Sequence, residues 1–493
     1  MKKKYHNTFY IIVLLLALSL SGCKTLRAPN TPYGLWVSPE KTEVSAPTAD
    51  SEWASVKDRR IEIDSSKPFA LGELVDIALR NNPSTQKAWQ EARAQEAKMR
   101  EVQGAWLPTI KVSATADRGK EIDNRADTSI TDYRRKYPVI DDHSEYGASA
   151  DLTYLIADFG GRSASIKESR EFLLSKNFDF NQEMLDVILE VEKSYYELYS
   201  AYSNLEAAQA DAEDAKTSLV AAEQKHKVGL VAKLDVYRAK ANYDNSLYSL
   251  EEAKGEIEAK KGNLAQVIGL SADTSFYVAK PKQEIPADVT SKNVSNLIEK
   301  GMEHRPDVQS TRATVRAKEA AVRVADSAIW PTLNFGLSAA ANWYHYYWDT
   351  NNNVTQPFDR DQSYRGFFTV NWDIFDGFAN VNKKRAAVAD FKASREELIR
   401  GEIAASNDVW TKYFSYKTAA KKYVFAESFY ESANVAYELA LESYVKGLAD
   451  MLDLLDAQSQ LSDARSKLIR SREDVFVSLA KLANATGSLY ISD

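Results

Sequence analysis

The feature that most limits how this 493-residue chain can fold is an internal repeat. Two proline positions recur 223 residues apart (306 − 83 and 331 − 108), and two turn glycines recur 218 apart (447 − 229 and 487 − 269). The offset changes from 223 to 218 between Pro108 and Asp158. We interpret part of that stretch as a surface loop, because such loops tolerate a change in length. The matched pairs are Asn82-Pro83 with Arg305-Pro306, Leu107-Pro108-Thr109 with Trp330-Pro331-Thr332, Gly229-Leu230 with Gly447-Leu448, and Gly269 with Gly487. We therefore expect two structural repeats, over 71–270 and 294–488.

Each repeat is predicted to contain a helix, two strands, a long helix and a further helix. The expected helices are 71–106, about 161–228 and 234–268 in the first repeat, and 294–329, 378–445 and 450–486 in the second. At 1.5 Å per residue the long helix spans about 100 Å, and the two shorter ones stacked together match it. Leu454, Leu461 and Leu468 recur every seven residues, with Ala457, Ala464 and Ser471 three positions after them. Such large-then-small seams favour knobs-into-holes packing, although an ordinary antiparallel coiled coil would show them too.

The predicted strands lie at about 108–156 and about 331–375, and they alternate between apolar and polar residues. Ile110, Val112 and Ala114 share one face, for example, and Lys111, Ser113 and Thr115 the other. Alternation over about ten residues is typical of strands between lipid and water. The run 343–348 (WYHYYW) suits an aromatic girdle at a membrane interface. The alternative is a pair of soluble hairpins with one face on a core. If the strands do lie in lipid, four of them cannot close a barrel, so several chains would have to share one barrel.

The N-terminus has the pattern of a secretion signal that ends at a lipidation site. Lys2, Lys3 and Lys4 precede an apolar run over 9–20, which is too short to span a membrane as a helix. Leu20-Ser21-Gly22-Cys23 resembles the lipobox of bacterial lipoproteins, and Cys23 is the only cysteine. The prediction is a signal peptide over 1–22 and a mature chain anchored through lipid on Cys23. Lys24, where an inner-membrane lipoprotein often has aspartate, favours the outer membrane.

Composition argues against several other functions. The net charge is −7 without a basic region, so nucleic-acid binding has no support. The five histidines are dispersed, and no cluster has metal-ligand spacing. Nucleophile and phosphate-loop motifs are missing as well. We therefore predict no catalytic residues, no metal and no cofactor, and a protein that is not an enzyme.

The repeat, the Pro-Thr pairs before the strands, Gly-Leu followed by Leu-Asp, and the lipobox together resemble the TolC-type outer-membrane factors, and the lipidated OprM/NodT branch in particular. The resemblance covers about 70–488. It implies a mainly α protein with membrane β-structure, in which three chains form a 12-stranded barrel and a long-helix α-barrel crosses the periplasm. A belt would come from 23–70 and 271–293, and 489–493 would be a tail. The implied partners are outer-membrane lipid, a periplasmic adaptor and an inner-membrane pump, expected to be proton-driven.

The resemblance also implies where the channel closes. The turns near Gly229 and Gly447 correspond to the closed end, and the segment 452–458 (LDLLDAQ) matches a motif whose aspartates, here Asp453 and Asp456, surround the aperture. The alternative is that these aspartates only stabilise a helix N-terminus. Tyr444 and Asp235 match residues that latch neighbouring helices. The arginine of that latch has no counterpart, since Ala449 occupies its position.

The function predicted from these features is that of an outer-membrane channel subunit, a passive duct in a tripartite export system. The main alternative is a periplasmic coiled-coil lipoprotein, a tether or adaptor without a pore, which would keep the lipobox and heptads but lack lipid-facing strands. A simple porin would need more strands per chain and little helix.

Overall fold

The structure, a computed structural model, describes residues 67–123, 139–280, 293–346, 348–350, 353–355 and 358–488. The predicted signal peptide, Cys23, most of the two belt segments and the tail lie outside these residues. The chain divides into two compact units. We call them the helical unit (Met1–Ala94, Leu174–Ala313 and Glu396–Asp493) and the strand unit (Gln95–Leu173 and Thr314–Arg395).

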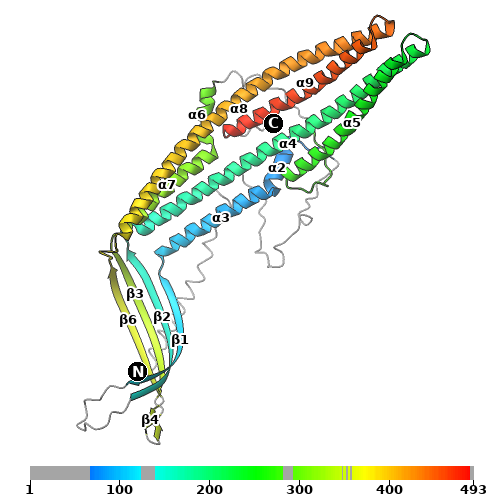
Figure 1. Cartoon of the computed structure of the whole chain (residues 1–493). Helices are drawn as coiled ribbons and strands as arrows, with labels where there is room; N and C mark the ends of the chain where they lie inside the picture. The colour runs from blue at the N-terminus through cyan, green and yellow to red at the C-terminus, as the bar shows by residue number, and fades with distance from the viewer. Residues whose placement is uncertain are drawn as a thin grey trace. The chain divides into compact units, whose positions relative to one another are not determined.

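The strand unit contains one antiparallel sheet of four long strands in the order β1-β2-β3-β6 (Figure 1). The strands are β1 (Thr109–Asp123), β2 (Val139–Ala157), β3 (Thr332–Tyr346) and β6 (Phe358–Asn371), close to the predicted ranges. A short pair that was not predicted, β4 (Trp348–Thr350) with β5 (Asn353–Thr355), lies between β3 and β6 in the sequence. Within the described residues β1 and β6 each pair on one side only, so both edges of this sheet are open.

The register places the alternating apolar residues of all four strands on one face of the sheet. Ile110 lies opposite Leu152, which lies opposite Leu337. On β3 and β6 the rings of Phe335 and Phe368 lie opposite each other with centroids 5.1 Å apart. In the single chain this face is not covered: Val112 is 77% exposed and Phe368 70%. An uncovered apolar face is what lipid contact requires.

The helices follow the predicted order with one correction. The structure contains α4 (Gly161–Lys227), α5 (Lys233–Val267), α8 (Ala379–Lys446) and α9 (Met451–Ala485) near the expected positions. The predicted helices 71–106 and 294–329 are each broken in two, as α2 (Leu71–Asn81) with α3 (Pro83–Gln103), and α6 (Val294–His304) with α7 (Pro306–Ser327). The breaks fall at Asn82 and Arg305, since a proline disfavours helical backbone in the residue before it and cannot donate a backbone hydrogen bond. Among the described helices, none is both long and apolar enough to cross a bilayer.

The two helix breaks form equivalent joints in the two repeats. The side-chain amide of Asn82 donates to the carbonyl of Val267 at the end of α5, at 2.8 Å. The guanidinium of Arg305 donates to the carbonyl of Ala485 at the end of α9, at 3.2 Å. Residues 267 and 485 are 218 apart, which is the repeat offset. The glycine two residues later has positive φ in both joints, and a side chain on Gly487 would meet the His304 backbone at 2.8 Å.

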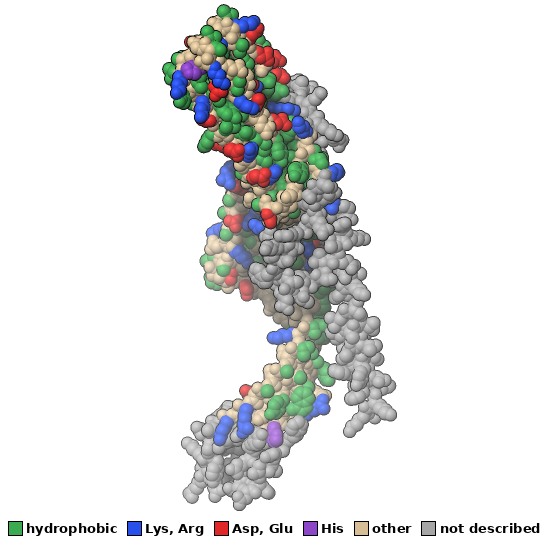
Figure 2. Space-filling model, turned by 90° about the vertical axis from the view of Figure 1, so that its right-hand side faces the viewer, with side chains coloured by type: hydrophobic (Ala, Val, Ile, Leu, Met, Phe, Trp, Pro, Cys, Tyr) green, Lys and Arg blue, Asp and Glu red, His purple; other side chains and the backbone are tan. Residues whose placement is uncertain are grey.

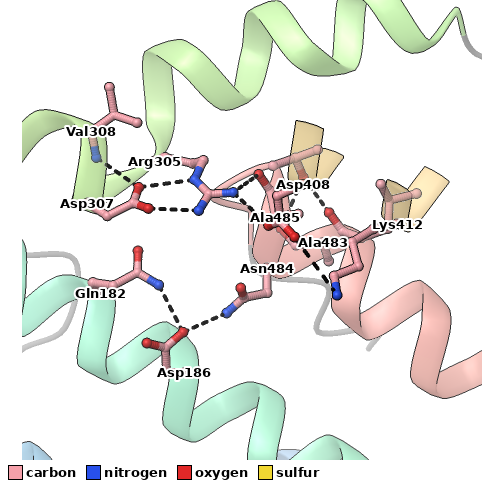
Figure 3. Close-up of polar contacts among 12 residues, drawn as sticks. Gln182, Asp186, Arg305, Asp307, Val308, Asp408, Lys412, Ala483, Asn484 and Ala485 are labelled. Carbon is pink, nitrogen blue, oxygen red and sulfur yellow. Dashed lines mark hydrogen bonds and ion pairs between the residues drawn. The ribbon is translucent and has the colours of Figure 1, made fainter. Parts of the chain in front are cut away.

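The second joint is an ion-pair cluster within the helical unit (Figure 3). Arg305 forms a two-bond pair with Asp307, at 3.0 and 2.7 Å, and contacts Asp408 of α8 at 2.9 Å. Burial alone would lower the pKa of Arg305, but the bonds to Asp307 and Asp408 outweigh it and raise the pKa. Asn484 donates to the Leu185 carbonyl and to Asp186 on α4. The cluster therefore connects α6, α8, α9 and α4.

In the helical unit α4, α5, α8 and α9 run alongside one another (Figure 1), and α9 contacts both α4 and α5. Of the predicted heptad leucines of α9, Leu454 and Leu461 are buried and Leu468 is half-buried. The outer face of α8 is different. Ile403, Trp410 and Val424, spaced by multiples of seven, are exposed by 67%, 49% and 61%. This face of α8 therefore has an apolar stripe that the described residues leave uncovered.

One buried carboxyl group makes the stability of the helical unit depend on pH. Glu192 of α4 is only 5% exposed, and burial raises its pKa from 4.5 to about 8. Between these values the folded chain holds a proton that the unfolded chain releases, so the free energy of unfolding falls as pH rises, by about 1.4 kcal/mol per pH unit.

We expect Glu192→Gln to raise the unfolding temperature at pH 8.5 and to leave it nearly unchanged at pH 5, because the glutamine has no proton to lose. Circular dichroism melts at the two pH values measure this. The control is Glu190→Gln on the same helix, whose side chain is 56% exposed and which should shift neither melt. Equal effects of the two substitutions at pH 8.5 would contradict the assignment.

Candidate aperture at the helix-pair turns

The candidate site lies where α4 turns into α5 and α8 turns into α9. Both turns have the same backbone, with Gly229 and Gly447 each at φ 79°. The amide of Leu230 donates to the Lys225 carbonyl at 2.9 Å, and that of Leu448 to the Ser443 carbonyl at 2.8 Å. This pattern ends a helix on a left-handed residue, which only glycine adopts without strain. The following leucines point outward, 72% and 80% exposed.

Asp453 and Asp456 lie on the first turns of α9, and both are exposed in the single chain. Asp453 and the N-cap residue Asp450 form a capping box: the Asp453 amide donates to the Asp450 carboxylate at 2.9 Å, and the Asp450 amide to the Asp453 carboxylate at 3.2 Å. Asp456 accepts from Gln460 at 2.7 Å. Asp453 therefore does stabilise the helix start, as the alternative interpretation holds, while its charge stays in contact with solvent.

Tyr444 and Asp235 are brought close to each other without a hydrogen bond between them. Tyr444 is 1% exposed, and its hydroxyl has no hydrogen-bond partner among the described residues. Burial raises the pKa of that hydroxyl, and the negative charge of Asp235 raises it further. A carboxylate oxygen of Asp235 lies 3.5 Å from a guanidinium nitrogen of Arg238. The predicted latch residues therefore share one environment, while an atom-to-atom latch is not formed in this chain.

Lys225 is a residue of this site that the sequence analysis missed. Its ammonium group, from the last turn of α4, donates to the Tyr444 carbonyl and lies 4.2 Å from the centre of the Tyr444 ring. A cation beside the carbonyl end of a helix and over an aromatic face is favourable on both counts. The contact joins the end of α4 to the end of α8. Its sequence signal was the basic run Lys225-His226-Lys227 at the helix C-terminus.

A second polar cluster connects the two helix pairs further from the turns. Arg465 of α9 bonds to Asp214, at 2.8 Å, and to Asp211, both on α4. Gln458 of α9 accepts from Ser218 at 3.3 Å and from Asn242 of α5 at 3.1 Å. Small side chains are fully buried on the same stretches of these helices, among them Ala215 of α4 and Ala464 of α9. Within the described ranges no three His, Cys, Asp or Glu residues could hold a metal ion.

Comparisons with known proteins agree with this geometry. The family model described as outer membrane efflux protein matches residues 74–270 and 297–488. Protein CyaE of Bordetella pertussis is 24% identical over 356 residues, which are 72% of this chain and 71% of CyaE. Outer membrane protein OprJ of Pseudomonas aeruginosa is 24% identical over 427 residues, 80% of this chain and 79% of OprJ. The solved CmeC outer membrane channel of Campylobacter jejuni has the same fold, with a TM-score of 0.70 at 20% identity over 85% of both chains.

Proposed function

This chain belongs to the outer membrane efflux protein family, and on that premise we propose that three copies of it form a lipid-anchored duct from the periplasm to the cell exterior. As a member it is an outer-membrane channel subunit of an efflux system in a Gram-negative bacterium, and it has no enzymatic step. The trimer, the anchor on Cys23 and the roles of individual residues are the proposal.

The observation that carries the proposal is the sheet, with one apolar face and two open edges. Open edges in lipid leave backbone groups without hydrogen bonds, so β1 of one copy is expected to pair with β6 of the next. Three copies supply 12 strands, enough for a closed barrel. The exposed apolar stripe on α8 includes Ile403 and Trp410. Packing of this stripe against another copy would remove apolar surface from water.

The duct itself has no source of energy, so its partners supply it. We propose a periplasmic adaptor around the helix-pair turns and an inner-membrane pump, driven by protons, behind it. At the turns three copies would bring together six carboxylates, from Asp453 and Asp456, which attract cations and repel anions. Tyr444 and Asp235, with Lys225 in place of the missing arginine, would hold the two helix pairs of a chain together when the channel is at rest.

The proposal is tested by membrane insertion and conductance of the purified full-length protein. Native mass spectrometry in detergent should give a trimer, and planar bilayers should show single-channel steps. Val112→Asp places a charge on the apolar face of β1 and should reduce insertion severalfold, because that face would contact lipid. Ser113→Asp, one residue along on the polar face, is the control and should insert like the wild type. A monomer without conductance would favour the coiled-coil lipoprotein instead.

A further inference from the structure

At the ends of the strands far from the helices, a cross-strand acidic row and a group of three cations lie on opposite faces of the sheet. The cross-strand row Asp117, Glu145, Tyr344 and Asp359 lies on the polar face. The row beside it, Ala116, Tyr146, Trp343 and Arg360, lies on the apolar face. The apolar face of β1 then continues with two further cations, Arg118 and Lys120, since the β1–β2 register has no bulge. We name Arg118, Lys120 and Arg360 the basic rim.

Figure 2 shows Lys, Arg and His side chains gathered at the lower end of the strand unit, beside a patch of hydrophobic side chains. The three cations of the basic rim are all exposed. Arg360 lies over the ring of Trp343, with its guanidinium carbon 5.7 Å from the ring centre. A guanidinium packed on an aromatic ring is well suited to the boundary between an apolar and a polar phase. The opposite face holds Asp117, Glu145 and Asp359. Asp142, however, lies opposite Lys120 in the β1–β2 register, which leaves Arg118 and Arg360 as the two cations whose opposite residue is not acidic.

The position of the basic rim along the strands fits the headgroup level of a membrane. Ten residue steps separate Leu333, near the start of β3, from Trp343. At about 3.3 Å per step and a tilt of about 40°, the apolar face between them is about 25 Å tall, the height of a lipid-facing band. Tyr146 and Trp343 end this band. Arg360 lies in their cross-strand row, and Arg118 and Lys120 lie two and four residues beyond that row along β1.

Cations that face lipid are unfavourable in the bilayer core and favourable beside anionic headgroups. Under the proposed function the helices lie in the periplasm, so the far ends of the strands lie at the outer leaflet. That leaflet in Gram-negative bacteria consists of phosphorylated glycolipid. We propose that the basic rim binds the phosphate groups of this glycolipid, with Arg360 and Arg118 as the principal donors, since guanidinium groups bind phosphate with two parallel hydrogen bonds.

The test measures the unfolding temperature of the full-length trimer in detergent after addition of bisphosphorylated lipid A, dephosphorylated lipid A or inorganic phosphate. We expect only the bisphosphorylated lipid to raise it clearly. Arg118→Gln/Arg360→Gln should lose most of that shift. The matched control is Lys111→Gln/Arg365→Gln, which removes one cation from each of the same two strands on the polar face and should keep the shift.

A wild type without a shift, an equal shift with dephosphorylated lipid, or an equal loss in both double variants would overturn the proposal. These outcomes are separate from a failure of the proposed function, because conductance is measured in bilayers of phospholipid alone. There Arg118→Gln/Arg360→Gln should conduct like the wild type. If the wild type does not conduct in such bilayers, the channel assignment fails, whatever the lipid result.

Discussion

Replacing Asp453 and Asp456 with alanine is expected to raise the single-channel conductance severalfold and to weaken its preference for cations. In the proposed trimer these carboxylates line the narrowest part of the duct, so their removal widens the opening and removes its negative field. Planar-bilayer recordings with a salt gradient measure conductance and selectivity in one experiment. The control is Asp463→Ala/Asp474→Ala, which removes two exposed carboxylates from the same helix far from the turn and should change neither quantity.

The capping role of Asp453 requires a second variant. Alanine at this position also removes the acceptor for the Asp450 amide, so a looser helix start could widen the opening without any effect of charge. Asp453→Asn/Asp456→Asn keeps side chains of nearly the same size with an acceptor oxygen. If charge sets selectivity, the asparagine variant loses cation preference while its conductance rises less than that of the alanine variant. If both variants match the wild type, the aperture assignment is wrong.

The parts of the fold that depend on local sequence could be predicted. Alternation located the outer limits of the two strand pairs within a few residues, because a sheet with one apolar face imposes a period of two. Turn glycines located the ends of α4 and α8, since a left-handed residue is needed there. The break before Pro83 was missed although the proline itself had been noted as a repeat marker. The pair β4 and β5 has no comparable signal, because strands of three residues are too short to show a pattern.

The contacts that connect the helices could not be predicted. Arg305 and Asp408 are 103 residues apart, and Arg465 and Asp211 are 254 apart. Charged residues occur all along these helices, and which of them meet depends on how far one helix is shifted along the next. At Gly269 and Gly487 the backbones of two segments approach so closely that a side chain would not fit, a contact that depends on this shift. A single sequence does not contain it. The same limit applies to Lys225, whose partner Tyr444 belongs to the other repeat.

Arg305→Ala is expected to lower the free energy of unfolding by about 2–3 kcal/mol. Removing one member of a buried ion pair usually costs about 3–5 kcal/mol. Here the cost is smaller because Asp307 and Asp408, 41% and 37% exposed, regain water, whereas the Ala485 carbonyl loses its donor. Urea unfolding followed by circular dichroism measures the change.

The control is Arg312→Ala, seven residues along and paired with Glu402 of α8 at 2.8 Å. Both side chains of this pair are about one-third exposed, so its loss should cost about 1 kcal/mol or less. Arg305→Lys keeps the charge but cannot make the two-bond pair with Asp307 while also reaching Asp408, so its stability should fall between those of the wild type and the alanine variant. Equal losses of unfolding free energy for Arg305→Ala and Arg312→Ala would show that burial does not make the Arg305 ion pairs more stabilising than an exposed pair. A larger loss at Arg305, partly restored by lysine, would show that the bonds of Arg305 to Asp307, Asp408 and the Ala485 carbonyl stabilise the joint.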